Sequence, residues 1–251
     1  MIVVENLHRH FGGFKAVDGA SLKIETGSIT GLIGPNGAGK TTLINIIAGL
    51  SRASAGTAKV MGFDVVEQFR DARKSIGIVP QELVFDPFFS VRETLRFQSG
   101  YFGLKNNDDW IDELLHSLSL ADKADSNMRT LSGGMKRRVM VAQALVHKPP
   151  VIVLDEPTAG VDVELRQTLW KFIVGLNEKG HTILLTTHYL EEAETLCNRI
   201  AMLKGGSVLT VDTTPNLLKK HASQTLNMQL NGVLPVSLES RVLKKDVIEG
   251  R

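Results

Sequence analysis

Several features that mark particular classes of protein are scarce in this chain of 251 residues. The single cysteine, Cys197, excludes a disulfide within the chain and is typical of a reducing compartment. A formal net charge of only +2 favours neither a nucleic-acid-binding surface nor a strongly anionic partner. The apolar runs at 151–154 and 183–185 are far too short to span a membrane, and we expect no secretory signal at the N-terminus. The hydrophobic content of 43% indicates an ordinary globular protein.

The most informative segment, residues 34–41, places glycines, a lysine and a threonine between an expected strand at 28–33 and an expected helix at 41–50. Glycines let backbone N–H groups curl around phosphate oxygens, and the helix N-terminus adds partial positive charge toward the same anion. Lys40 supplies a point charge for the β- and γ-phosphates, and Thr41 supplies a hydroxyl for Mg²⁺. The pattern predicts a phosphate-binding P-loop rather than a plain glycine-rich turn. Its residues are Gly34, Pro35, Asn36, Gly37, Ala38, Gly39, Lys40, Thr41 and Thr42.

Two carboxylates, Asp155 and Glu156, directly follow the apolar run 151–154. Four apolar residues in a row suit a central parallel strand buried on both faces, and open α/β sheets bind ligands at the carboxyl ends of such strands. Asp155 is therefore a candidate Mg²⁺ ligand acting through water, and Glu156 is a candidate general base for attacking water. Without the P-loop, a strand followed by an acidic helix start would be the better interpretation.

A second pair of glycines, Gly133 and Gly134, opens an expected helix over 135–147. With the Ser132 hydroxyl at the cap they form a second anion-binding nest, although alone the segment would more often be an ordinary flexible N-cap. If this nest and the P-loop both bind one γ-phosphate, the simplest geometry is a two-fold symmetric pair of chains. Each nest would then face the P-loop of the other chain.

The order of expected elements predicts an α/β fold, with a P-loop NTPase core, an N-terminal antiparallel β subdomain and an inserted α-helical subdomain. Residues 1–26 have the alternation of antiparallel strands, and the alternation of strands and helices resumes at 151. Between them, Ser90 and Glu93 form a capping-box pattern that starts a helical stretch.

These signals also suggest where the domain ends. We expect one domain over residues 1–215, with the helical subdomain inserted at about 82–147. Residues 216–251 have weak patterning, and we expect a short C-terminal extension that is partly disordered.

Together these segments resemble the ATP-binding-cassette (ABC) family, and the match covers roughly residues 1–215. The order and spacing of five family motifs agree with this chain. Residues 34–42 resemble the P-loop of the family, and Gln81 resembles the glutamine of its Q-loop. Residues 131–134 resemble the family signature, residues 159–162 the D-loop, and His188 the switch histidine. The longer strings 131–138, 155–162 and 186–194 look more specifically like bacterial exporter ATPases of the ABC-2 type.

The resemblance implies an enzyme that hydrolyses ATP with Mg²⁺ and drives transport. It implies a homodimer of ATPase subunits, formed head to tail when ATP binds, that works with a separate integral-membrane permease. Such a subunit would lie at the cytoplasmic face of the bacterial plasma membrane. The alternative is a soluble ABC ATPase acting on the ribosome or DNA. Those proteins often carry two cassettes or a long coiled-coil insertion, and this chain has one cassette and no heptad run. We therefore expect no nucleic-acid partner.

The resemblance also implies roles for single residues. In the family arrangement Gln81 reaches Mg²⁺ and the attacking water, and His188 contacts the γ-phosphate. Asp162 would communicate between the two sites of the dimer. Ser132 and Gly134 would close the site of the opposite subunit. By themselves, Gln81 fits a simple turn residue and His188 an ordinary surface histidine.

Two positions depart from the family pattern. Met135 replaces a glutamine that many members carry, at a place that does not touch phosphate in the family arrangement. Phe11 stands where members usually have a tyrosine that stacks on adenine, and stacking needs only the ring face. His10 and Phe14 are nearby alternatives, and a core aromatic on a strand is the other interpretation of Phe11.

Three features have less specific interpretations. The aromatic residues at 85–89 fit either a permease docking groove or the core of the helical subdomain. The basic run 136–138 is expected to be a solvated helix face. Cys197 is expected to be a half-buried helix residue without chemistry.

Overall fold

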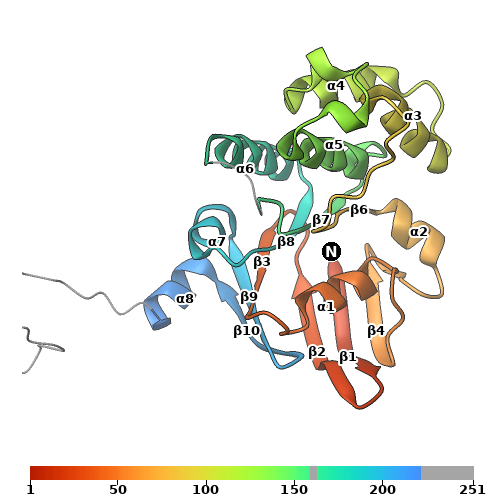
Figure 1. The fold of residues 1–251 in the computed structure, drawn as a ribbon. Coiled ribbons are helices and arrows are strands. Elements are labelled where there is room, and N and C mark those ends of the chain that lie inside the picture. The colour runs from red at the N-terminus through yellow and green to blue at the C-terminus, as the bar shows by residue number, and fades with distance from the viewer. Residues whose placement is uncertain (159–162, 222–251) are drawn as a thin grey trace, which may run out of the picture.

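The computed structural model describes residues 1–158 and 163–221 (Figure 1). The strands are β1 Ile2–Phe11, β2 Phe14–Ile24, β3 Ile29–Ile33, β4 Ala55–Val60, β5 Phe63–Asp64, β6 Ile76–Val79, β7 Val151–Asp155, β8 Thr182–Thr186, β9 Arg199–Lys204 and β10 Ser207–Thr213. The α-helices are α1 Lys40–Ile47, α2 Phe69–Lys74, α3 Val91–Tyr101, α4 Asp108–Ser117, α5 Gly133–Leu145, α6 Val163–Glu178, α7 Leu190–Leu196 and α8 Thr214–His221. Short 3₁₀ turns occupy Ala121–Lys123 and Met128–Thr130.

The strands form two sheets. One has six strands in the order β10-β9-β3-β8-β7-β6, parallel except for the antiparallel edge strand β10. The other has four strands in the order β2-β1-β4-β5, all antiparallel. The predicted α/β class, with an antiparallel β part at the N-terminus, is confirmed.

The core lies on both faces of the six-stranded sheet, because successive side chains of a strand point to opposite sides. Val151 and Val153 of β7 join the cluster that contains α1 and the four-stranded sheet. Ile152 and Leu154 join the cluster of α5, α6 and α7 on the other face. Each fully buried side chain of this kind stabilises the fold by about 1.5–3 kcal/mol. The prediction that 151–154 is a central strand buried on both faces is confirmed.

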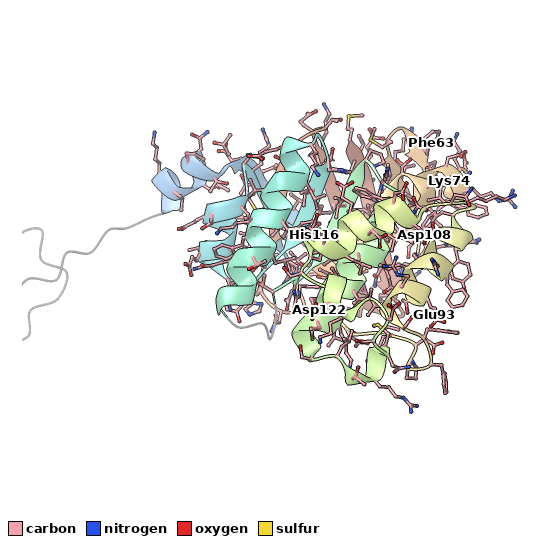
Figure 2. The ribbon with its side chains drawn as sticks, turned by 90° about the horizontal axis from the view of Figure 1, so that it is seen from above. Phe63, Lys74, Glu93, Asp108, His116 and Asp122 are labelled. Atoms are coloured by element: carbon pink, nitrogen blue, oxygen red, sulfur yellow. The ribbon has the colours of Figure 1, made fainter. Side chains whose placement is uncertain are left out.

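A helical layer lies between β6 and β7 in the sequence and packs above the sheet in Figure 1. Its first helix, α3, starts with the predicted capping box. The Glu93 N–H donates to Ser90 Oγ at 3.3 Å, and the Ser90 N–H donates to Glu93 Oε2 at 2.8 Å. The Arg96 side chain of α3 then binds both oxygens of Asp108 on α4, at 2.8 and 3.1 Å. Figure 2 views this layer from above, with Glu93 and Asp108 labelled.

Some element ends differ from the sequence expectation. The first helix ends at Ile47 rather than residue 50, because Gly49 adopts a positive φ of 67° and terminates it. Cys197 is buried rather than half-buried, and burial raises the pKa of its thiol to about 12, which makes it unreactive at neutral pH. Regular structure continues past residue 215, because α8 extends to His221. The D-loop residues 159–162 lie outside the described residues.

None of the helices in the described part of the chain is long and apolar enough to cross a bilayer.

Candidate active site

The register of the parallel strands brings several predicted site residues to one edge of the sheet. Leu32 of β3 lies opposite Thr186 of β8, and Thr186 lies opposite Asp155 of β7. Val79 of β6 lies opposite Leu154 of β7. The segments after these four strands therefore begin side by side at their carboxyl ends, and they carry the P-loop, Glu156, His188 and Gln81.

The P-loop is packed so closely that two of its glycines have no room for a side chain. A Cβ on Gly34 would clash with the backbone oxygen of Leu203 on β9. A Cβ on Gly39 would clash with the backbone oxygen of Ala16 on β2, and Gly39 also has a φ of 99°. The loop is thus held between the two sheets in a conformation that requires glycine. This close backbone packing suits a loop that wraps an anion with its N–H groups.

Lys40, the first residue of α1, lies inside this loop. Its side chain is buried, with the residue 7% exposed, and Nζ donates to the carbonyl oxygens of Gly34 at 2.7 Å and Pro35 at 3.1 Å. Thr41 follows it and is exposed. A cation, a hydroxyl and a helix N-terminus therefore lie together at one point, which is the donor set that a polyphosphate needs. The residues present fit a nucleoside triphosphate.

Thr186 of β8 contacts both residues of the acidic pair, Asp155 through its carboxylate and Glu156 through its backbone. The Thr186 hydroxyl donates to Asp155 Oδ1 at 2.5 Å, and the Glu156 N–H donates to the same hydroxyl at 2.9 Å. Asp155 is buried, and Glu156 has a positive φ of 49°, which is uncommon for a residue other than glycine. Strain of this kind costs on the order of 1–3 kcal/mol and occurs mainly at functional positions. No role for Thr186 was predicted; from the neighbouring strand it binds the Asp155 carboxylate and the Glu156 backbone N–H.

The three residues predicted to be catalytic converge on one carboxylate oxygen. Gln81 Nε2 donates to Glu156 Oε2 at 3.0 Å. His188 Nδ1 lies 3.5 Å from the same oxygen. The Glu156 side chain is only 14% exposed, whereas that of His188 is 46% exposed. A base that is shielded from water on one side and flanked by an amide and an imidazole can orient one water molecule and accept its proton.

The expectation that 136–138 is a solvated helix face is wrong for Arg137. Arg137 is 5% exposed, and its guanidinium donates to the backbone oxygens of Pro80 at 2.6 Å and Gln81 at 2.7 Å. Burial lowers its pKa, and the carboxylates of Asp155 and Glu156 act in the opposite direction. Arg137 therefore ties α5 to the backbone that positions Gln81. The Arg138 side chain is also held, by the backbone oxygens of Leu118 and Ser119.

We expect Arg137→Met to destabilise the fold by about 1–3 kcal/mol, because a buried guanidinium that donates two hydrogen bonds to backbone oxygens is lost. Its ATP turnover should also fall while ATP affinity changes little, since the displaced group is Gln81 rather than the P-loop. Denaturant unfolding and steady-state kinetics measure the two effects. Arg52→Met, at an exposed position, is the matched control. Unchanged turnover in a folded Arg137→Met protein would remove Arg137 from the positioning of Gln81.

Ser132 caps α5 as predicted, and its hydroxyl accepts the Met135 N–H at 3.2 Å. Ser132 and Gly133 are exposed, so the helix N-terminus is open to a ligand. Within one chain, however, α5 packs on one face of the sheet and α1 on the other (Figure 1). The two predicted anion-binding segments thus begin helices on opposite faces of one sheet.

Phe11 ends β1 and pairs with Phe14 across the turn into β2. Its side chain is not in the core, since the residue is 52% exposed, which excludes the interpretation as a core aromatic. The guanidinium of Arg9 lies 4.4 Å from its ring centre. The other ring face is the kind of surface on which a base stacks.

Comparison with known proteins identifies the family. Residues 17–159 match the family model described as ABC transporter. The Nod factor export ATP-binding protein I of Burkholderia lata is 43% identical over 203 residues, covering 80% of this chain and 67% of that protein. The linearmycin resistance ATP-binding protein LnrL of Bacillus subtilis is 36% identical over 228 residues, covering 90% and 73%.

Solved structures agree with this family. The ATP-binding subunit of an ABC transporter superposes with a TM-score of 0.82 at 27% identity, covering 88% of this chain and 92% of that chain. A dimeric ATP-binding cassette in a post-hydrolysis state, bound to ADP and Pi, superposes with a TM-score of 0.78 at 26% identity, covering 85% and 99%. This chain belongs to the ABC transporter family, as the ATP-binding and ATP-hydrolysing subunit.

Proposed function

We propose that this protein energises an ABC-2 type exporter, by ATP-dependent head-to-tail dimerisation that drives a separate permease. The observation that carries the catalytic part is the convergence of Gln81 and His188 on Glu156, beside a P-loop that contains Lys40. The export role rests on similarity to proteins named for Nod factor export and linearmycin resistance. The subunit would lie at the cytoplasmic face of the bacterial plasma membrane, held there by the permease.

ATP binding is assigned to the residues around the P-loop. Phe11 stacks on adenine, and residues 34–42 hold the phosphates, with Lys40 on the β- and γ-phosphates. Mg²⁺ would be held by oxygen atoms, which this ion prefers. The candidates are the Thr41 hydroxyl, the Gln81 amide and, through water, the Asp155 carboxylate that Thr186 orients. Bound Mg²⁺ would neutralise charge on the phosphates.

Hydrolysis transfers the γ-phosphoryl group to water. Water attacks the phosphorus, its proton passes to Glu156, and the bond to the bridging oxygen of ADP breaks. Gln81 orients the water, and His188 holds the γ-phosphate. The 3.0 Å contact from Gln81 and the 3.5 Å contact from His188 support these roles, because both side chains lie beside Glu156. Little reorganisation is then needed at the moment of reaction.

The dimer completes the site. Ser132, Gly133 and Gly134 of a second chain would bind the γ-phosphate from the side opposite the P-loop, which fits the exposure of Ser132 and Gly133 at the start of α5. Only the ATP-filled state gains these contacts, so ATP shifts the equilibrium toward the closed pair. Asp162, outside the described residues, would communicate between the two sites.

A groove of about 400 Å³ beside the helical layer is the proposed docking place for the permease. It is lined by the end of α1, by β6 and by α3 and α5, with Leu50, Val84, Phe102, Met140 and His147 among its residues. His147 stacks on Phe102 at 3.7 Å, and burial lowers the pKa of its imidazole to about 4, so this imidazole is neutral at physiological pH and Arg73 is the cation of the lining. In the aromatic segment 85–89, Phe85 packs on the core and Phe88 is exposed.

The proposed domain is residues 1–215, with the helical subdomain at about 82–147 and an extension from 216. In this division the helical subdomain carries Ser132 and the part of the groove wall formed by α3 and α5, so it would link movement of the permease to closure of the ATP site.

The test is capture of the tagged chain from detergent-extracted membranes of its native host. An integral-membrane protein of about six spans is expected, and Val84→Glu should abolish its capture because a charge enters the apolar groove. Leu209→Glu, at another exposed apolar residue on β10, is the matched control and should retain the partner. Ribosomes or DNA in place of a membrane protein would favour the alternative function.

A further inference from the structure

We propose that His8, His10 and Asp18 form a binding site for a transition-metal ion of the Zn²⁺ type on the outer surface of the β1–β2 hairpin. One ligand atom of each residue lies within 4.8 Å of the others. Two imidazoles and a carboxylate select zinc-like ions over Mg²⁺, which prefers oxygen ligands. The site is separate from the catalytic residues, and the proposal does not depend on the proposed function.

The hairpin places the three side chains together for a reason visible in its register. His8 and His10 are two residues apart on β1, and their ring centres lie 5.9 Å apart. The ladder between β1 and β2 has register shifts on either side of Arg9, where Arg9 pairs with Val17. These irregularities bring Asp18 beside His8, with Oδ1 3.0 Å from Nδ1.

The hydrogen bonding around His8 favours a cation. Its Nδ1 faces the Gly19 N–H at 3.2 Å and Asp18 Oδ1 at 3.0 Å. Its Nε2 lies 3.2 Å from Asn6 Oδ1, and a neutral ring that donates there can only accept at Nδ1, which leaves Asp18 Oδ1 facing a nitrogen without a proton. An ion that accepts electron pairs from both His8 and Asp18 removes this conflict. The Gly19 N–H is exposed and can turn to water.

Lys15 lowers the expected metal affinity of the site but leaves one Asp18 oxygen available as a ligand. Its Nζ binds Asp18 Oδ2 at 3.0 Å, which is the other oxygen of the carboxylate. Oδ1 remains directed toward His8. The ammonium charge opposes a dication nearby, so removal of this charge should tighten metal binding. A generic surface site would not show this specific dependence on Lys15.

The experiment titrates Zn²⁺ into metal-depleted, nucleotide-free full-length protein by calorimetry, with Mg²⁺ in excess. We expect one zinc ion per chain, with affinity about 10–100-fold weaker in His10→Ala, since a ligand is lost. His10 is exposed, so this variant should fold normally, and circular dichroism checks that. His116→Ala, on α4 (labelled in Figure 2), is the matched control and should bind zinc normally.

Two further variants make the assignment specific. Lys15→Gln should bind zinc up to about tenfold more tightly. His188→Ala should leave binding unchanged, which separates this site from the carboxylate and imidazole of the catalytic centre. Equal zinc affinity in His10→Ala and the unaltered chain, zinc lost in His188→Ala, or no zinc binding at all would each overturn the proposal.

Discussion

Replacing Glu156 with glutamine is expected to lower the rate of ATP hydrolysis by about 10²–10⁴-fold while ATP binding stays intact. Glutamine has the same shape, so the contacts from Gln81 and His188 can persist in altered form, but it cannot accept a proton from water. The loss should therefore appear in kcat rather than in the ATP dissociation constant. Single-turnover hydrolysis and equilibrium binding of labelled ATP measure the two quantities separately.

Glu191→Gln is the matched control for this prediction. Glu191 is an exposed carboxylate in the first turn of α7, three residues after His188, and carries no part of the site. Its removal should leave turnover within a factor of about two, as expected for a surface substitution. If Glu156→Gln hydrolysed ATP at the full rate, Glu156 would not be the base.

A second large effect is expected when two inactive variants are combined. Lys40→Ala should weaken ATP binding itself, because the loop loses its buried cation. Ser132→Glu should block closure, because a carboxylate would face the γ-phosphate. Each variant alone has both sites of its dimer damaged. In the mixed dimer both defects fall in one site, and the other site has an intact Lys40 from one chain and an intact Ser132 from its partner.

The mixed dimer should therefore recover hydrolysis at about half the rate of the unaltered dimer, if the two sites turn over independently. Two affinity tags in sequence isolate the heterodimer, and mass spectrometry verifies its composition. Each variant assayed alone at the same total concentration is the control and should stay inactive. Absence of recovery in a verified heterodimer would mean that each chain builds its site alone.

Local patterns were enough to predict the P-loop, the capping box at Ser90 and the buried strand at 151–154. Each of these depends on neighbours within a few residues, such as a glycine beside a helix start or an unbroken apolar run. The convergence of Gln81 and His188 on Glu156 was expected only from the resemblance to a family. Its physical origin is the strand register, which aligns β6, β7 and β8 and is not visible in any one segment.

Arg137 and Thr186 show what the sequence alone did not reveal. Arg137 was assigned to solvent because it stands between Lys136 and Arg138. Yet it lies in the same helical stripe as Met140, Val141 and Ala144, all buried, so the period of α5 did carry a signal. Its partners are backbone oxygens 56 and 57 residues away, which no local pattern indicates. Thr186 likewise binds residues 30 and 31 positions away, at the end of the neighbouring strand β7.

The central claim is that ATP holds two copies of this chain together through its γ-phosphate. Light scattering of the Glu156→Gln protein with ATP and Mg²⁺ tests it most directly, because hydrolysis cannot release the pair. We expect a mass of twice the 27.4 kDa of one chain with ATP, and a mass of one chain with ADP or after addition of the Ser132→Glu change. A mass of one chain at saturating ATP, even with the membrane partner present, would contradict the account.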